Sequence, residues 1–312
     1  NPKIELAQTL RLNMGSKIGD LLSVCSHRLR PYELVKGSVN AMTHKWHEAG
    51  MSYTRTGAIF GFKNFAAKLV SDFASIAVQP TGLTGKKRVG VVGLMGKAMA
   101  DFWELFKKFL EDEGCEVVIP HFSDYSLVTP MNEKANRKFM TSNTGMWIGA
   151  RAQEGVINLY RKPAAKALAQ QGKGMFLPML TPEELYARAM KLVSPTAQDG
   201  EGWCVAGQYS YLIENGITNI LTLVPFGCMS AYVSLKGVHS TLKRLYPQVN
   251  IMHLDFDVGS SISNQLNRIK LMLGTAHDGP SAIIPPPPPS SSESPSPSSA
   301  ATTPSSTPAP SN

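Results

Sequence analysis

The feature that most constrains the fold is an alternation of short apolar runs with longer amphipathic stretches between residues 220 and 273. ILTLV is the pattern of a buried strand that stops at Pro225, and VNIMHL repeats this pattern at residues 249–254. Each run is followed by apolar residues at helical spacing, first over residues 230–246 and then from Ile262. This order predicts parallel strands that are joined by helices.

A similar unit lies upstream. KRVGVVGL, at residues 87–94, is rich in β-branched residues and predicts a strand; Phe102–Glu113 predicts an amphipathic helix, and CEVVIP predicts the next strand. Together the units predict a three-layer α/β domain with a parallel, flavodoxin- or Rossmann-like sheet over residues 85–275. Residues 1–84 show helical spacing and few strand signals, so we expect an N-terminal helical region there.

Residues 276–312 differ in composition from the rest of the chain. They hold 11 of the 22 prolines, many serines and only two charged side chains. Such a segment cannot bury enough apolar surface to offset the entropy lost on ordering. We expect a disordered tail, partly in the polyproline II conformation.

The net charge and the spacing of the cysteines limit the kinds of partner and the cellular location that we expect for the protein. The net charge is +8, but the basic residues occur as scattered pairs without a basic run, which favours a basic surface over a specific nucleic-acid partner. Attraction to an acidic partner or to a CoA phosphate stays open. The four cysteines, Cys25, Cys115, Cys204 and Cys228, lack the spacing of a disulfide framework. With no apparent signal peptide or membrane-spanning run, we expect a cytoplasmic protein without a membrane partner.

Three stretches carry a resemblance to a known family. The first stretch covers about 55 residues and contains, in this order, the segments PFGCM, KG, YP, NI and DFDVGSSISNQLNRIKLML. It resembles the C-terminal signature of the 2-hydroxyacyl-CoA dehydratase component family, in particular its activase-related branch. The resemblance extends to two further stretches. The second contains RVGVVG and FLEDEGCEVVIPHFSDYSL, and the third is GEGWCVAGQYSYLIENGITNI. Together the three stretches cover about residues 87–125 and 199–274. The chain departs from the family pattern at Leu94, where a carboxylate is usual, and at Cys204, where an apolar residue is usual.

The resemblance implies an iron–sulfur component. In the family, cysteines hold a [4Fe-4S] cluster that receives an electron from an ATP-dependent activator, and an acyl-CoA substrate then loses water. On this basis Cys228 is the candidate metal ligand, and Lys236 and Arg268 are candidates for binding the CoA phosphates. A structural ion pair between Arg268 and Asp257 is the alternative for that arginine.

The function has two main interpretations. One is the C-terminal part of an iron–sulfur 2-hydroxyacyl-CoA dehydratase-like component, a lyase or related reductase, with the other cluster ligands in missing sequence or another subunit. The alternative is a degenerate, non-catalytic binding or scaffold subunit that kept the fold without a complete cluster. Without the resemblance, the sequence favours a buried structural role for Cys228, which is the commonest role of an isolated cysteine. A third hypothesis is a basic nucleotide-binding α/β protein. Gly93 and Gly96 could belong to a phosphate loop, but a full motif is absent, so a tight strand-to-helix turn is favoured. A helix N-terminus with Lys97 near a CoA phosphate is the alternative.

Other polar residues admit both functional and structural roles. Asp255 and Asp257 could act as general bases or metal ligands, yet Ser260 or Ser261 beside them would equally suit a capped turn before a helix. The isolated histidines do not have zinc-ligand spacing.

Overall fold

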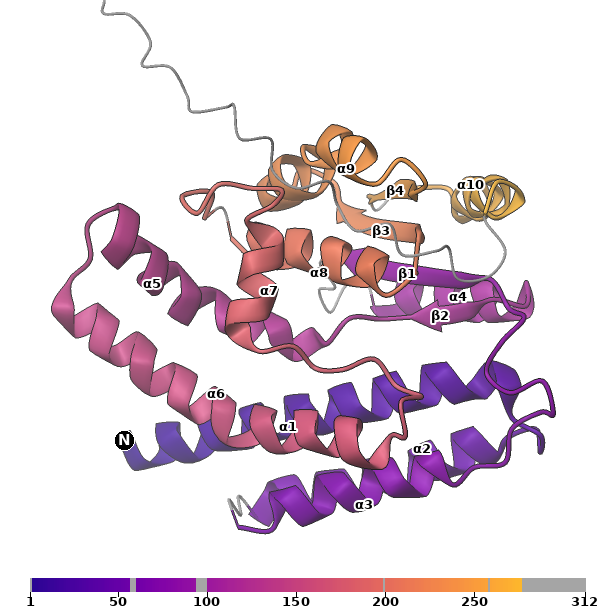
Figure 1. Cartoon of the computed structure of the whole chain (residues 1–312), viewed down its shortest axis with the longest axis horizontal. Helices are drawn as coiled ribbons and strands as arrows, with labels where there is room; N and C mark the ends of the chain where they lie inside the picture. The colour runs from indigo at the N-terminus through magenta and orange to yellow at the C-terminus, as the bar shows by residue number, and fades with distance from the viewer. Residues whose placement is uncertain (1, 57–59, 94–99, 199, 258, 277–312) are drawn as a thin grey trace, which may run out of the picture.

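A parallel four-stranded sheet with the strand order β2-β1-β3-β4 is the centre of the fold (Figure 1). This computed structural model describes residues 2–56, 60–93, 100–198, 200–257 and 259–276. The strands are β1 (Arg88–Gly93), β2 (Glu116–Val118), β3 (Asn219–Pro225) and β4 (Asn250–Phe256). All three neighbouring pairs are parallel, so the predicted parallel α/β sheet is confirmed.

Helices cover both faces of the sheet. Side chains such as Leu221 and Leu223 pack on one face against α4 (Ala100–Asp112) and α10 (Ile262–Gly274). Ile220 and Val224 point to the other face because side chains alternate along a strand. That face is covered by α8 (Gly202–Glu214), the π-helical turn η4 (Ala231–Lys236) and α9 (His239–Leu245). The predicted three-layer arrangement is therefore confirmed.

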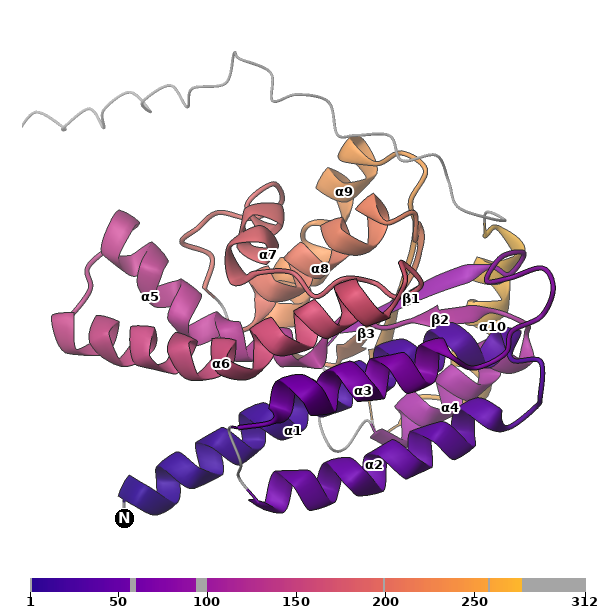
Figure 2. The ribbon, with the colours of Figure 1, turned by 60° about the horizontal axis from the view of Figure 1, so that its bottom comes forward.

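The N-terminal region is helical, as predicted. It contains α1 (Pro2–Leu29), the short 3-10 turn η1 (Arg30–Tyr32), α2 (Ser38–Thr56) and α3 (Phe62–Ala74). These helices share one apolar core with Tyr160 and Leu168 of a much later helix, α6 (Thr144–Gln171). Figure 2 shows α6 running alongside α1 and α3. The helical layer is thus assembled from two separate parts of the chain.

Three elements connect the helical layer to the sheet. The 3-10 turn η3 (Phe122–Leu127) follows β2 and leads into α5 (Val128–Phe139), which forms a hairpin with α6. The helix α7 (Pro182–Ala189) then packs against α8. Its start has a complete capping box, in which the Thr181 hydroxyl accepts from the Glu184 N–H and the Glu184 carboxylate accepts from the Thr181 N–H.

The helix predicted over residues 230–246 is interrupted. Its first part is the π-helical turn, which is closed by a 3.0 Å hydrogen bond from the Gly237 N–H to the Tyr232 carbonyl. A side chain at Gly237 would place its Cβ 2.1 Å from the Val233 carbonyl oxygen. The extra residue of a π turn shifts the helical phase, and Val233, one of the apolar residues at helical spacing in this segment, is exposed.

Some sequence predictions lie outside the described residues. These are the disordered tail over all but the first of its residues, and the possible phosphate-loop residues Gly96 and Lys97. Within the described part of the chain, no helix combines the length and apolar character needed to cross a membrane.

Candidate functional site at the carboxyl edge of the sheet

The strand order creates a switch point between β1 and β3. The chain leaves β1 toward α4 on one face and leaves β3 toward η4 and α9 on the other. In sheets of this kind, ligands bind in the crevice at the carboxyl ends of the two strands. The strand ends approach closely here, because a Cβ on Gly93, whose φ is 129°, would lie only 2.2 Å from the Leu223 carbonyl oxygen.

Cys228 lies in the turn directly after β3, at the edge where the sequence predicted it. The turn is fixed by hydrogen bonds from the Phe226 N–H to the Phe256 carbonyl (2.8 Å) and from the Cys228 N–H to the Pro225 carbonyl (3.1 Å). Gly227 has a φ of 72°, which glycine adopts without steric cost. The Cys228 thiol is half-buried, with its Sγ atom 3.4 Å from the Ser230 Oγ atom.

The other three cysteines are buried. Cys204 packs on α8 with Trp203 and Tyr211, in a different apolar cluster from that of Cys228. Burial raises the pKa of the Cys25, Cys115 and Cys204 thiols, which disfavours the thiolate form that binds metals. No group of three or more His, Cys, Asp or Glu side chains in the described ranges could hold a metal ion. The donors in the described part of the chain therefore do not by themselves fit a complete four-iron cluster, which needs four ligands.

Lys236, the first candidate for binding a CoA phosphate, has partners within the chain. Its Nζ atom lies 2.5 Å from the Asp255 Oδ1 atom and 4.1 Å from the centroid of the Tyr232 ring. The Tyr232 hydroxyl donates to the same carboxylate oxygen at 3.1 Å. Asp255, considered above as a base or metal ligand, is therefore part of an ion pair on the α9 side of β4.

Arg268, the second candidate, binds the outer edge of β4. Its guanidinium donates to the His253 carbonyl at 2.8 Å, and the Gln265 side chain donates to the Asp255 carbonyl at 2.9 Å. These side chains of α10 satisfy two carbonyls of the last strand of the sheet, which protects that edge from pairing with another chain. Neither Arg268 nor Lys236 forms a hydrogen bond or ion pair with Cys228 among the residues described.

The loop after β4 has the structural role that the serines indicated. The Asp257 N–H donates to the Ser260 hydroxyl at 3.0 Å, and the Ser261 hydroxyl accepts from the Asn264 N–H at 3.4 Å. Ser261 is therefore the N-cap of α10.

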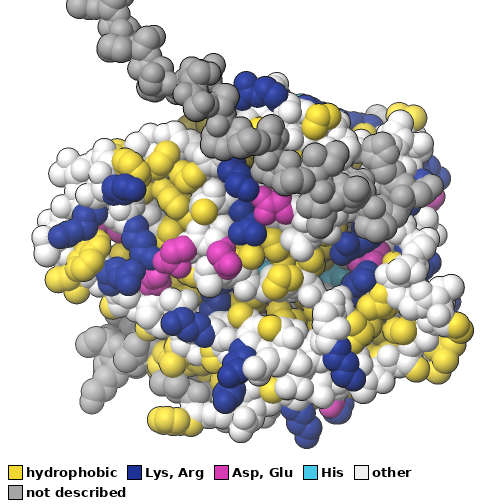
Figure 3. All heavy atoms as spheres, viewed as in Figure 1, with side chains coloured by type: hydrophobic (Ala, Val, Ile, Leu, Met, Phe, Trp, Pro, Cys, Tyr) yellow, Lys and Arg dark blue, Asp and Glu magenta, His cyan; other side chains and the backbone are white. Residues whose placement is uncertain are grey.

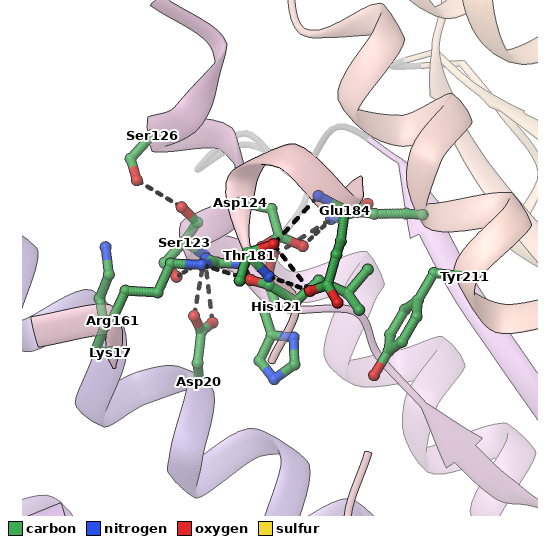
Figure 4. Close-up of polar contacts among 12 residues, drawn as sticks. Lys17, Asp20, His121, Ser123, Asp124, Ser126, Arg161, Thr181, Glu184 and Tyr211 are labelled. Carbon is green, nitrogen blue, oxygen red and sulfur yellow. Dashed lines mark hydrogen bonds and ion pairs between the residues drawn. The ribbon is translucent and has the colours of Figure 1, made fainter. Parts of the chain in front are cut away.

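A buried charged cluster beside the end of β2 was missed by the sequence analysis. We call it the β2 cluster; Figure 4 shows most of its side chains converging from α1, η3 and α6. Its members come from four elements that are distant in sequence, and all are less than a tenth exposed. They are Lys17, Asp20, His121, Ser123, Asp124, Arg161 and Gln208.

Most polar groups of the β2 cluster are satisfied. Arg161 pairs with Asp124 at 2.7 Å and also donates to the Leu180 carbonyl at 2.9 Å. The Asp20 carboxylate accepts from the Ser123 N–H at 3.2 Å. Lys17 donates to Asn13 and Ser16 of its own helix. These bonds dock α1 and α6 onto the segment that follows β2.

Burial controls the titration of the β2 cluster. It lowers the pKa of Lys17 to about 8, raises the pKa of Asp20 and lowers the pKa of His121. The His121 Nε2 atom has no hydrogen-bond partner within the described part of the protein. The cluster has the properties of a docking contact between layers rather than of a solvent-accessible reaction centre.

Comparison of the chain with protein-family models, with curated proteins and with solved structures finds no significant match.

Proposed function

We propose that the chain is a 2-hydroxyacyl-CoA dehydratase-type component whose Cys228 contributes one ligand to an iron–sulfur cluster. The observation that carries the proposal is the position of this thiol. Among the four cysteines it is the one that is not buried, and it follows β3 at the switch point of the sheet. Ligand sites of such folds occupy this position.

The remaining ligands come from another polypeptide in this proposal. Cys25, Cys115 and Cys204 are buried, so they are not available to complete the site. The resemblance implies an ATP-dependent activator as the electron donor and an acyl-CoA as the substrate. A cytoplasmic location suits this function because four free thiols persist in a reducing compartment.

The contacts of Lys236 and Arg268 bear on how a CoA would bind. Lys236 would have to exchange Asp255 for a phosphate, and Arg268 would have to leave the His253 carbonyl. An acyl-CoA at these residues stays a prediction. Titration with desulfo-CoA would check it, since Lys236→Met should weaken binding and Lys243→Met, on the neighbouring helix α9, should not.

A second candidate function is a non-catalytic scaffold. The incomplete donor set and the internal use of Lys236 and Arg268 favour it. The two candidates differ in a property that is simple to measure, which is iron binding.

Anaerobic reconstitution with iron and sulfide tests the proposal. Added 2-mercaptoethanol would supply thiolates in place of the missing ligands. The wild-type chain and Cys204→Ala should then bind iron and absorb visible light, whereas Cys228→Ser should lose both signals. Equal iron in wild type and Cys228→Ser would contradict the role of Cys228. A wild-type chain without iron would favour the scaffold function.

A further inference from the structure

The turn and helix that follow β3 carry four exposed apolar or aromatic side chains within five residues of Cys228 in the sequence. Phe226 is 70% exposed, Met229 69%, Val233 53% and Tyr232 38%. We call these four residues the Cys228 rim. Exposed apolar groups that gather in one patch indicate an interaction surface, whereas scattered ones do not.

The side chains of the Cys228 rim are uncharged. The segment PFGCMSAYV, residues 225–233, has no charged side chain, although the whole chain has a net charge of +8. The next charged residue, Lys236, is neutralised by Asp255. The exposed Asp257 follows Phe256, whose carbonyl accepts from the Phe226 N–H, so two copies of this surface can approach one another with few like charges between them.

The tip of the α5–α6 hairpin is the contrasting case. It also exposes apolar groups, among them Met146 at 61%. However, Arg137 lies over the Trp147 ring at 4.6 Å and Lys138 over the Phe139 ring at 4.9 Å, and neither cation has an ion pair among the residues described. Figure 3 shows dark blue cationic side chains beside yellow apolar ones over these helices. Two such tips would repel one another, so this surface does not suit self-association.

The size of the Cys228 rim matches the centre of a protein interface. Four side chains with these exposed fractions present on the order of 400 Å² of mainly apolar surface, which is comparable with the largest patch of a typical monomer. A standard interface buries about 800 Å² on each partner, so the rim would provide roughly half of it.

We propose that a second copy of this chain packs on the Cys228 rim across a two-fold axis. A two-fold interface uses the same surface on both copies, and a neutral apolar surface is complementary to itself. The dimer places two Cys228 thiols in one interface, so the second copy contributes a further donor to the proposed iron site. The inference of a dimer depends only on the Cys228 rim. The link between the dimer and iron rests on the proposed function.

Sedimentation equilibrium of the full chain under reducing conditions tests the dimer. Met229→Asp places a charge in the rim, and Met146→Asp places the same charge on the hairpin tip at a side chain of similar exposure. We expect a dimer for wild type and for Met146→Asp, with a dissociation constant at least about tenfold higher for Met229→Asp. Circular dichroism would establish that both variants are folded.

Two outcomes would overturn the dimer. A wild-type chain that stays monomeric at high micromolar concentration would assign the rim to a different polypeptide. A dimer broken by Met146→Asp but not by Met229→Asp would move the interface to the hairpin tip. Iron binding that persists in a variant that is monomeric would refute the link between the dimer and iron while leaving the proposed function intact, so the two failures are distinguishable.

Discussion

The Cys228 rim and the β2 cluster both lie at the carboxyl edge of the sheet, yet they are built in opposite ways. The β2 cluster is charged and buried, and most of its groups have internal partners. The Cys228 rim is neutral and exposed, and it surrounds a half-buried thiol. Ionisable groups in a fold of this kind therefore do not by themselves mark the functional site.

The comparison separates residues that hold the layers together from residues that are available to a partner. Substitutions in the β2 cluster should change stability. Substitutions in the rim should change association and iron binding, with little effect on stability. Three experiments follow, from the largest expected effect on stability to the smallest.

Arg161→Ala should be the most destabilising substitution. It leaves the buried Asp124 carboxylate without its cation and the Leu180 carbonyl without its donor. Loss of one partner of a buried ion pair costs about 3–5 kcal/mol of unfolding free energy. Urea denaturation would measure the change, with the exposed neighbour Lys162→Ala as a control that should stay within about 0.5 kcal/mol of wild type. Equal stability of the two variants would show that the ion pair does not hold the layers.

The stability of the protein should rise with pH above 8 through Lys17. Burial lowers the pKa of Lys17 to about 8 in the folded state, below its ordinary value of 10.5. Between these two values the unfolded chain binds more protons than the folded chain, so the free energy of unfolding increases with pH. Between pH 8 and pH 10 we expect the free energy of unfolding of the wild-type protein to increase by on the order of 2 kcal/mol more than that of Lys17→Met.

Urea denaturation of both proteins at several pH values would measure that difference. Lys166→Met is a suitable control because this lysine is exposed on α6. Parallel pH profiles for wild type and Lys17→Met would contradict a desolvated amine at this position.

Arg268→Ala should have the smallest effect on unfolding. It removes the hydrogen bond to the His253 carbonyl on the edge of the sheet, which contributes about 1 kcal/mol. Lys270→Ala, which alters another exposed cation on the same helix, is the matched control and should cost less. A larger loss of desulfo-CoA affinity than of stability in Arg268→Ala would instead support a role for Arg268 in binding CoA.

The fold was predictable because each strand is a short apolar run and each covering helix has an apolar side. The break after η4 was harder to predict, because a π turn depends on the hydrogen bond made by Gly237 and not on apolar spacing. The position of Cys228 was also predictable, since a cysteine just after a buried strand must lie at the carboxyl edge of a parallel sheet.

Pairings between distant residues were not predictable from local patterns. In the sequence, Asp20 and Arg161 look like ordinary charged residues of helices. They are buried because α1 and α6 both pack beside η3, which the local sequence does not indicate. Likewise, Lys236 pairs with Asp255 because β4 lies beside β3. Arg268 donates to a backbone carbonyl, and such a partner cannot be identified from residue types.

Alkylation of the native protein before and after anaerobic iron loading tests the central claim most directly. Iodoacetamide labelling mapped by mass spectrometry would report each cysteine separately. The account predicts that Cys228 is labelled first in the iron-free protein, that the buried Cys25, Cys115 and Cys204 are protected, and that iron loading then protects Cys228. Equal labelling of Cys228 with and without bound iron would contradict its role as a ligand.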